Sequence, residues 1–203
     1  MQILAAAAAD FELNAVKKRL KGVADIDFAV MGVGVLPTAY SLTRLLSQKK
    51  YDWVFNVGIA GTFSNKIALG EAVVVERESL GESGVESVEG AISAFPKELQ
   101  SGVDLRCPYV SDFPFLQSVK KASGITVNLL TESKLRVQSR ASLADVETME
   151  GAAFFYVCLR EKVKFLQLRG ISNQVGERDK AKWEIAEALN SVGDLLMLVL
   201  CNL

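Results

Sequence analysis

The 203-residue sequence contains no histidine. This absence excludes Ser-His-Asp and Cys-His catalysis, a histidine general base and most zinc sites. Acid–base chemistry near neutral pH must then use carboxylates, lysine, tyrosine, cysteine or an activated water. Hydrolysis through an oxocarbenium-like transition state suits such a chain, because a carboxylate can deprotonate water and also stabilise positive charge.

Cysteine is scarce, and long apolar runs are missing. Cys107, Cys158 and Cys201 are widely spaced and form no Cys-x-x-Cys motif, which disfavours a disulfide framework and favours a reducing compartment. The apolar run 195–200 is far too short to cross a bilayer. The run 3–9 has no basic residue before it, unlike a secretory signal. We expect a soluble, cytoplasmic protein that does not bind membranes.

An excess of charge of one sign is also missing. The chain has 23 basic and 24 acidic residues, a formal net charge of -1, and the two signs are interspersed. Binding to nucleic acid would require a basic stripe or patch. The sequence therefore predicts no nucleic-acid partner.

What the sequence does contain is half apolar residues, arranged in alternating short apolar runs and amphipathic segments. The expected strands are 2–8, 27–31, 53–57, 72–76, 125–130, 145–148 and 165–171. The expected helices are 11–20, 38–46, 131–142, 151–160 and 180–200. This alternation predicts an α/β fold: one three-layer domain, residues 1–203, with a mixed, mostly parallel central sheet flanked by helices. Residues 78–90 are expected to be a long loop, and 113–121 an interface or a surface helix.

In such sheets the functional site lies beyond the carboxyl ends of the strands. Five segments therefore qualify as parts of one site, and we expect their side chains to lie together. These segments are 9–12, 32–34, 58–61, 149–151 and 172–176.

Two acidic residues in these segments are candidates for chemistry. Glu12 follows the first strand and is either a solvated acid in a first helical turn or a general base for water. Glu150 opens an apolar helix and is either an ordinary first-turn acid or a ligand that binds a cis-diol through two hydrogen bonds.

Two glycine-rich segments let the backbone approach a ligand closely, although tight turns explain them equally well. They are Gly32-Val33-Gly34 and Gly58-Ile59-Ala60-Gly61. Neither completes a dinucleotide-binding or Walker motif. Neither contains Arg or Lys, so neither forms an obvious phosphate cradle.

The last candidates follow the strand 165–171. Asn173 carries both an acceptor and donors, which suits the N7/O6 edge of a 6-oxopurine, although asparagine is also common in turns. Arg169 and Ser172 lie beside it. Arg178 and Trp183 come next, and a surface arginine with a core tryptophan is the alternative to a binding role.

Several of these segments together resemble the nucleoside phosphorylase/hydrolase superfamily over nearly the full length of the chain. The matching pieces are Ala8-Ala9-Asp10-Phe11-Glu12, Gly32-Val33-Gly34, Asn56-Val57-Gly58-Ile59-Ala60-Gly61, Gly124-Ile125-Thr126-Val127-Asn128, Glu147-Thr148-Met149-Glu150-Gly151-Ala152-Ala153 and Arg169-Gly170-Ile171-Ser172-Asn173. Within the superfamily, the stretch Ser172-Asn173-Gln174-Val175-Gly176-Glu177-Arg178-Asp179 with the later Trp183 is most similar to the futalosine hydrolase family.

The resemblance implies an enzyme that needs no metal or cofactor and hydrolyses a purine nucleoside. It implies that Glu12 activates water, Glu150 binds the ribose hydroxyls, and Met149 packs against the sugar. It also implies that Ile59, Ala60, Gly61, Arg169, Ser172 and Arg178 bind substrate. The substrate would be futalosine, in which a ribose joins hypoxanthine to a 5′ carboxybenzoyl group, and the pathway would be menaquinone biosynthesis.

Two positions depart from related nucleosidases. Asn173 stands where adenine-specific relatives carry an Asp that protonates N7, and Ile59 stands where they carry Ser. Both departures favour a futalosine hydrolase, which releases hypoxanthine. They argue against the first alternative, a methylthioadenosine/S-adenosylhomocysteine nucleosidase, which releases adenine. A purine nucleoside phosphorylase and a non-catalytic nucleoside-binding module are further alternatives.

Two expectations concern the surroundings of this site. Arg178, Arg169 or Lys97 would meet the 5′ carboxylate, and the loop 78–90 could close over it. The resemblance also implies a homodimer or a larger homo-oligomer.

Overall fold

The computed structural model describes residues 1–22, 26–81, 83–86, 92–94 and 105–203. Residues 82 and 87–90 of the expected loop 78–90 lie outside this part of the chain, as does Lys97. Within the described ranges, no helix is long and apolar enough to span a bilayer.

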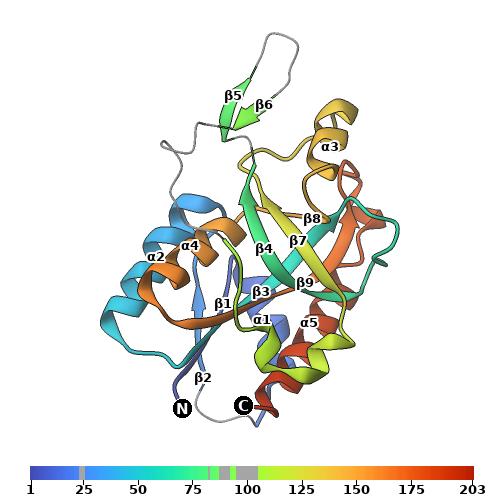
Figure 1. Cartoon of the computed structure of the whole chain (residues 1–203). Coiled ribbons are helices and arrows are strands. Elements are labelled where there is room, and N and C mark those ends of the chain that lie inside the picture. Colours follow the sequence, from blue (N-terminus) through green and yellow to red (C-terminus); the bar gives the residue numbers. More distant parts are fainter. Residues whose placement is uncertain (23–25, 82, 87–91, 95–104) are drawn as a thin grey trace.

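Seven strands form one sheet in the order β2-β1-β3-β8-β7-β4-β9 (Figure 1). They are β1 (Ile3–Ala7), β2 (Ile26–Val30), β3 (Trp53–Thr62), β4 (Ala72–Leu80), β7 (Lys121–Thr126), β8 (Val146–Thr148) and β9 (Lys164–Gln174). A separate antiparallel pair contains β5 (Gly84–Glu86) and β6 (Ile92–Ala94). In the large sheet only the β3–β8 and β4–β9 pairings are antiparallel, so the expected mixed, mostly parallel sheet is confirmed.

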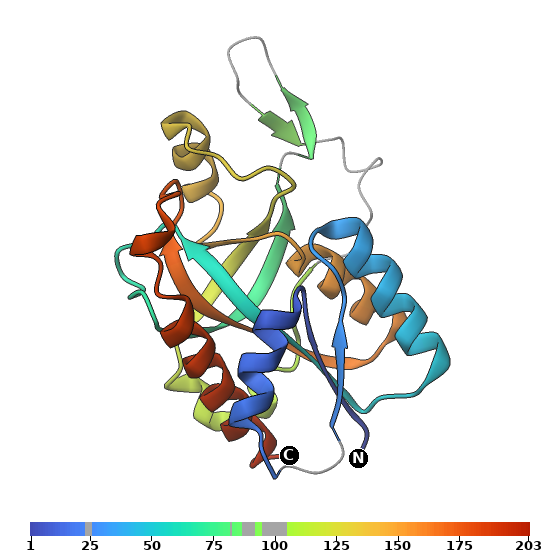
Figure 2. The ribbon, with the colours of Figure 1, turned by 180° about the vertical axis from the view of Figure 1, so that it is seen from behind.

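In the described part of the chain, five α-helices accompany the sheet, and their packing gives the layers. They are α1 (Asp10–Arg19), α2 (Val35–Gln48), α3 (Lys134–Ala141), α4 (Gly151–Glu161) and α5 (Ile185–Leu200). Helix α1 packs beside α5, and α2 packs beside α4. The two pairs flank the sheet from opposite sides (Figures 1 and 2).

Strand β1 shows why the apolar sequence folds in this way. All five of its residues are buried, and it lies between β2 and β3. A parallel strand that is covered on both faces needs a continuous apolar run, which Ile3-Leu4-Ala5-Ala6-Ala7 provides. The strand leads directly into α1, so the first turn of that helix is held at the carboxyl end of the sheet.

Five of the strands close into a ring, which the sequence did not predict. β3 pairs with β9 as well as with β1 and β8, so β3, β8, β7, β4 and β9 form a closed circuit. The pairing of β3 with β9 is parallel and extends from Trp53 and Lys164 to Thr62 and Gln174. Closure brings side chains from strands that are distant in sequence onto one interior.

Three expected elements end at different positions. The segment 58–61 is not a turn, because β3 continues through it to Thr62. The expected strand 125–130 is β7, which ends at Thr126, and residues 128–130 are exposed. The expected loop 78–90 begins as strand, since β4 extends to Leu80.

The helix expected at 180–200 begins only at Ile185. Asp179 accepts a hydrogen bond from the Ala181 N–H and caps a single 3-10 turn, η4 (Lys180–Lys182). Trp183 then has an extended backbone, with φ of -91° and ψ of 130°, which separates the turn from the helix.

The segment 113–121 is not a surface helix. It contains the 3-10 turn η3 (Pro114–Gln117), which follows the similar turn η2 (Val110–Asp112), and it ends at the start of β7. Phe113 and Leu116 are buried in the core of this chain. The ring of Phe113 packs edge-on against Trp53, with 5.2 Å between centroids. The apolar residues of this segment therefore cover this chain's own core.

Candidate active site

Glu12 lies in the first turn of α1 with its carboxylate turned inward. Oε2 accepts a hydrogen bond from the Ala9 N–H at 3.1 Å, and Oε1 accepts one from the Ile59 N–H at 2.9 Å. The side chain is buried, which does not fit a solvated first-turn acid. Burial raises the pKa of Glu12 above its usual 4.5; Arg169 and the two N–H groups oppose the rise, and Glu150 adds to it.

Glu150 is the N-cap residue of α4, but its carboxylate does not cap that helix. Oε1 instead accepts a hydrogen bond from the Gly34 N–H at 3.0 Å. Gly34 has a φ of 95°, a left-handed conformation that glycine adopts without strain. This geometry directs the N–H of the glycine segment 32–34 towards the Glu150 carboxylate.

The guanidinium of Arg169 lies near the carboxylates of both Glu12 and Glu150. Its Nη2 is 3.8 Å from Oε2 of Glu150, and its charge also acts on Glu12. The side chain is 1% exposed, yet Nε and Nη2 have no hydrogen-bond partner among the described residues. Buried donors are nearly always satisfied, so this guanidinium retains capacity for a water or a ligand oxygen.

Gly58 leaves the space in which the Arg169 guanidinium and the Glu12 carboxylate lie. It pairs with Arg169 across β3 and β9. A Cβ atom on Gly58 would lie 2.5 Å from Nη1 of Arg169 and 2.5 Å from Oε1 of Glu12. The glycine therefore provides space for protein side chains, which the sequence did not indicate.

Asn173 and Ser172 lie at an irregularity in the pairing of β3 with β9. Ile171 pairs with Ala60 and Asn173 pairs with Gly61, so Ser172 is the extra residue of a bulge. The Ser172 hydroxyl lies 2.8 Å from Oδ1 of Asn173 and 3.3 Å from the Ala60 carbonyl oxygen. Bulges of this kind redirect side chains and are frequent beside active sites.

The amide of Asn173 is only partly engaged. Oδ1 accepts from Ser172, and Nδ2 donates to the Gln174 carbonyl oxygen at 2.9 Å. These bonds use one lone pair and one amide hydrogen, which leaves one of each for a ligand. Asn173 could therefore both donate to and accept from the edge of a purine base.

The remaining expected site residues, apart from Arg178, lie on β3 or beside Glu150. Ile59, Ala60 and Gly61 are the part of β3 beside Glu12 and Asn173. Met149 directly precedes Glu150 and is partly buried.

Arg178 is exposed, and its guanidinium lies over the ring of Trp183 at 5.6 Å from the centroid. The exposure of Arg178 fits the alternative of a surface arginine, but Trp183 is only partly buried and is not the core residue that this alternative expected. No contact places Arg178 against Glu12, Glu150 or Asn173.

One acidic residue of this region, Glu78 on β4, was not among the candidates expected from the sequence. Its carboxylate is buried and accepts hydrogen bonds from Gln167 at 2.6 Å and from Thr126 at 3.0 Å. Burial raises the pKa of Glu78 to about 7, and the bonds from Gln167 and Thr126 limit the rise. In the sequence Glu78 lies in the expected loop 78–90, so only its place in the ring reveals it.

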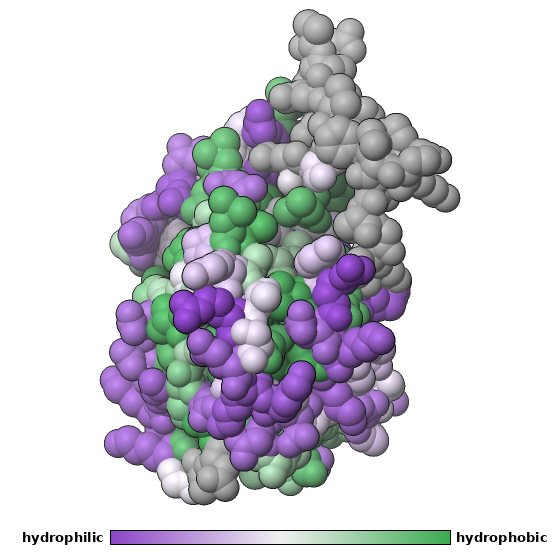
Figure 3. Space-filling model, turned by 90° about the vertical axis from the view of Figure 1, so that its left-hand side faces the viewer, coloured by the Kyte–Doolittle hydropathy of each residue, from purple (hydrophilic) through white to green (hydrophobic). Residues whose placement is uncertain are grey.

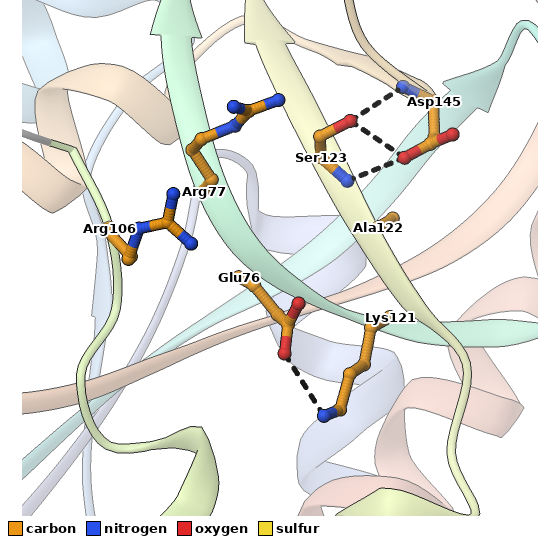
Figure 4. Close-up of a pocket in the computed structure, with 7 residues that line it drawn as sticks. All are labelled: Glu76, Arg77, Arg106, Lys121, Ala122, Ser123 and Asp145. Atoms are coloured by element: carbon orange, nitrogen blue, oxygen red, sulfur yellow. Dashed lines mark hydrogen bonds and ion pairs between the residues drawn. The ribbon is translucent and has the colours of Figure 1, made fainter.

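A separate cavity lies on the outer side of β4 and β7 (Figure 4). It has a volume of about 220 Å³ and is lined by Glu76, Arg77, Arg106, Lys121, Ala122, Ser123 and Asp145. Its acidic groups are engaged, Glu76 with Lys121 at 3.2 Å and Asp145 with Ser123 at 2.7 Å. None of the expected site residues lines this cavity.

A closed ring of mostly parallel strands, with two buried carboxylates and a guanidinium at one edge, defines a class of α/β protein. The family model described as the phosphorylase superfamily matches residues 26–200. The chain belongs to the phosphorylase superfamily. The resemblance stated from the sequence and the expected fold class are both confirmed.

Individual relatives within this superfamily are futalosine hydrolases and 5'-methylthioadenosine/S-adenosylhomocysteine nucleosidases. The chain is 32% identical to the futalosine hydrolase of Thermus thermophilus, over 85% of this chain and 80% of that protein. It is 25% identical to a 5'-methylthioadenosine/S-adenosylhomocysteine nucleosidase of Bacillus velezensis, over 75% of this chain and 70% of that protein. The fold matches a structure of a futalosine hydrolase mutant from Helicobacter pylori strain 26695, with a TM-score of 0.84 at 17% identity and full coverage of both chains.

Proposed function

We propose that this protein is a futalosine hydrolase, which releases hypoxanthine from futalosine and leaves dehypoxanthine futalosine for menaquinone biosynthesis. The observation that carries the proposal is the convergence of Glu12 and Glu150 on the buried Arg169. The similarity to the Thermus thermophilus enzyme supports it. The whole chain, residues 1–203, would serve as one domain.

The mechanism uses the carboxylates in different roles. Glu12 takes a proton from a water that attacks the anomeric carbon, and its raised pKa makes it a better base than an exposed glutamate. Glu150 accepts hydrogen bonds from the ribose hydroxyls, and these bonds strengthen as the sugar flattens towards an oxocarbenium ion. The bond between the anomeric carbon and N9 breaks, and its electron pair leaves with the base. The base takes up a proton from solvent to give hypoxanthine, and Glu12 releases to solvent the proton that it took from the attacking water.

Asn173 selects the base. Its free amide hydrogen donates to O6 or N7 of hypoxanthine as charge accumulates on the leaving base. It cannot deliver a proton, which an Asp at this position could do for adenine. Ile59, Ala60 and Gly61 would form the wall beside the nucleoside, and Met149 would pack against the sugar.

Futalosine in phosphate-free buffer tests the reaction. We expect the purified protein to release hypoxanthine at a rate that added phosphate does not change. If hypoxanthine forms only when phosphate is present, the protein is a phosphorylase and the hydrolase proposal is wrong. If Glu12→Gln turns over as fast as the wild type, Glu12 does not activate water.

A second candidate is a 5'-methylthioadenosine/S-adenosylhomocysteine nucleosidase, because a relative of that name covers 75% of this chain. Adenine release from methylthioadenosine, measured beside hypoxanthine release from futalosine, decides between the two. A higher kcat/KM for methylthioadenosine would replace the first proposal.

We also propose that the protein is a cytoplasmic homo-oligomer. Val33, Leu36 and Tyr40 are exposed around the start of α2, and Leu36 is 81% exposed. On the side of the molecule that carries α2 and α4, apolar side chains are visible among the polar ones (Figure 3). Sedimentation velocity tests the oligomer: we expect a dimer or larger species, and a monomer for Leu36→Glu.

A further inference from the structure

The carboxylate of Glu78 is the centre of a buried hydrogen-bond network. Oε1 accepts from Gln167 at 2.6 Å and from the Thr148 hydroxyl at 3.4 Å, and Oε2 accepts from the Thr126 hydroxyl at 3.0 Å. Asn56 donates in turn to Gln167 at 3.0 Å. Each of the five ring strands contributes one of these side chains, so the closed ring is what assembles the network.

The two hydroxyls of this network also bind the first turn of α4. The Gly151 N–H donates to the Thr148 hydroxyl at 3.2 Å, and the Ala152 N–H donates to the Thr126 hydroxyl at 2.7 Å. The first N–H groups of a helix lack partners within the helix and are usually satisfied by the N-cap side chain. Here the N-cap residue is Glu150, which makes no such bond.

The packing around Glu78 fixes where its carboxylate lies. A Cβ atom on Gly151 would lie 1.9 Å from Oε1 of Glu78, and one on Gly124 would lie 2.4 Å from it. Both neighbours are glycine, so the carboxylate lies directly against the backbone of β7 and of the first turn of α4. The Thr126 and Thr148 hydroxyls also lie 3.3 Å from each other. A hydroxyl has one hydrogen, and where Glu78 accepts it, the oxygen of that threonine keeps its lone pairs for the helix N–H groups.

We propose that Glu78 is a positioning residue for Glu150: by orienting the Thr126 and Thr148 hydroxyls, it takes over the capping of α4 and leaves the Glu150 carboxylate free to bind substrate. The inference rests on the proposed function, in which Glu150 holds the ribose. It predicts that Glu78 affects catalysis through Glu150 and not by contact with the substrate.

A double-mutant cycle tests this dependence. Glu78→Gln keeps the shape of the side chain but replaces one acceptor oxygen with a donor. At about pH 8, above the pKa of about 7 that burial gives Glu78, we expect kcat/KM for the nucleoside to fall roughly 10- to 100-fold in the wild-type background. In a Glu150→Gln background the same change should cost less than about twofold, because coupled residues are not additive.

Glu76→Gln is the matched control. Glu76 lies on the same strand, is partly exposed and pairs with Lys121 at 3.2 Å, so its substitution should leave kcat/KM unchanged. An equal loss from Glu78→Gln in both backgrounds, or no loss at all, overturns the proposal. If Glu78→Gln does not fold, Thr126→Val replaces it, and Thr126→Ser, which keeps the hydroxyl, should restore kcat/KM.

Amide hydrogen exchange separates this inference from the proposed function. We expect the Gly151 and Ala152 amides of Glu78→Gln or Thr126→Val to exchange at least about tenfold faster than in the wild type, with the α5 amides unchanged. Unchanged exchange at Gly151 and Ala152 overturns the positioning role whatever the activity. Faster exchange in a protein that cleaves no nucleoside would mean that the proposed function alone has failed.

Discussion

Arg169 and Glu150 form a buried ion pair in which Nη2 and Oε2 are 3.8 Å apart and the two side chains are 1% and 7% exposed. Glu12 is close enough to both that the arginine lowers its pKa and the glutamate raises it. One buried guanidinium therefore compensates two buried carboxylates, and the stability of the protein depends on it.

Arg169→Met should be strongly destabilising. The substitution leaves two buried carboxylates without a positive partner, and removing one member of a buried pair costs about 3 kcal/mol or more. Urea denaturation measures the loss. The control is Arg19→Met, because Arg19 pairs with Asp194 at 3.2 Å with both side chains well exposed, and there we expect less than about 1 kcal/mol. Similar losses in both variants would contradict a buried pair.

Glu78→Gln should change how stability depends on pH. In the folded protein, burial raises the pKa of Glu78 from its usual 4.5 to about 7, so between these pH values the folded state holds an extra proton. Stability is full below this window and falls as pH rises through it, by about 3 kcal/mol. Glutamine does not titrate, so the variant should gain about that much relative to wild type between pH 5 and pH 8.

Urea denaturation of both proteins at several pH values measures this difference. The raised pKa of Glu12 acts in the same direction, but it is present in both proteins and cancels. A difference between wild type and variant that stays constant from about pH 5 to pH 8 would mean that Glu78 has no raised pKa.

Glu12→Gln should lower kcat by a factor on the order of 10² to 10⁴, because it removes the general base. We expect the fold to stay intact. In the wild type, kcat/KM should fall as pH decreases through the raised pKa of Glu12, since only the ionised carboxylate accepts a proton from water. Steady-state kinetics across pH measure both effects. Asp10→Asn, an exposed acid in the same helical turn, should change neither.

Asn173→Asp should shift the preference of the enzyme from hypoxanthine towards adenine nucleosides. An Asp can supply a proton to adenine N7, whereas Asn173 can only donate a hydrogen bond. We expect the ratio of kcat/KM for methylthioadenosine to that for futalosine to rise on the order of tenfold or more. Asn65→Asp, at an exposed position, is the control. An unchanged ratio would mean that Asn173 does not face the base.

Two features of the candidate site could be predicted from the sequence, because both are local. The apolar run of β1 followed at once by Glu12 places an acid at the end of a buried strand. The run Thr148-Met149-Glu150-Gly151 places another acid at the start of a buried helix. Whether two such acids meet depends on the order of the strands in the sheet. In a parallel sheet the carboxyl ends of the strands lie at one edge, so we expected the two acids to lie there together.

Glu150 does lie near Glu12, as expected, but the strand before it is not parallel to all its neighbours. β8, the strand before it, is antiparallel to β3 and very short, and pairs with only Gly61 and Thr62 of that strand. The chain therefore turns back towards the middle of β3, where Gly58 pairs with Arg169. No periodicity in three residues distinguishes an antiparallel strand from a parallel one.

The amino-acid sequence by itself determined the alternation of strands and helices, the choice of carboxylates over histidine, and the family, since each depends on composition or on short runs of neighbouring residues. Only the tertiary structure decided the closed ring, the buried pairing of Arg169 with Glu150 and the position of Glu78. These depend on contacts between residues 19 to 112 positions apart, whose energies come from burial that no local pattern encodes.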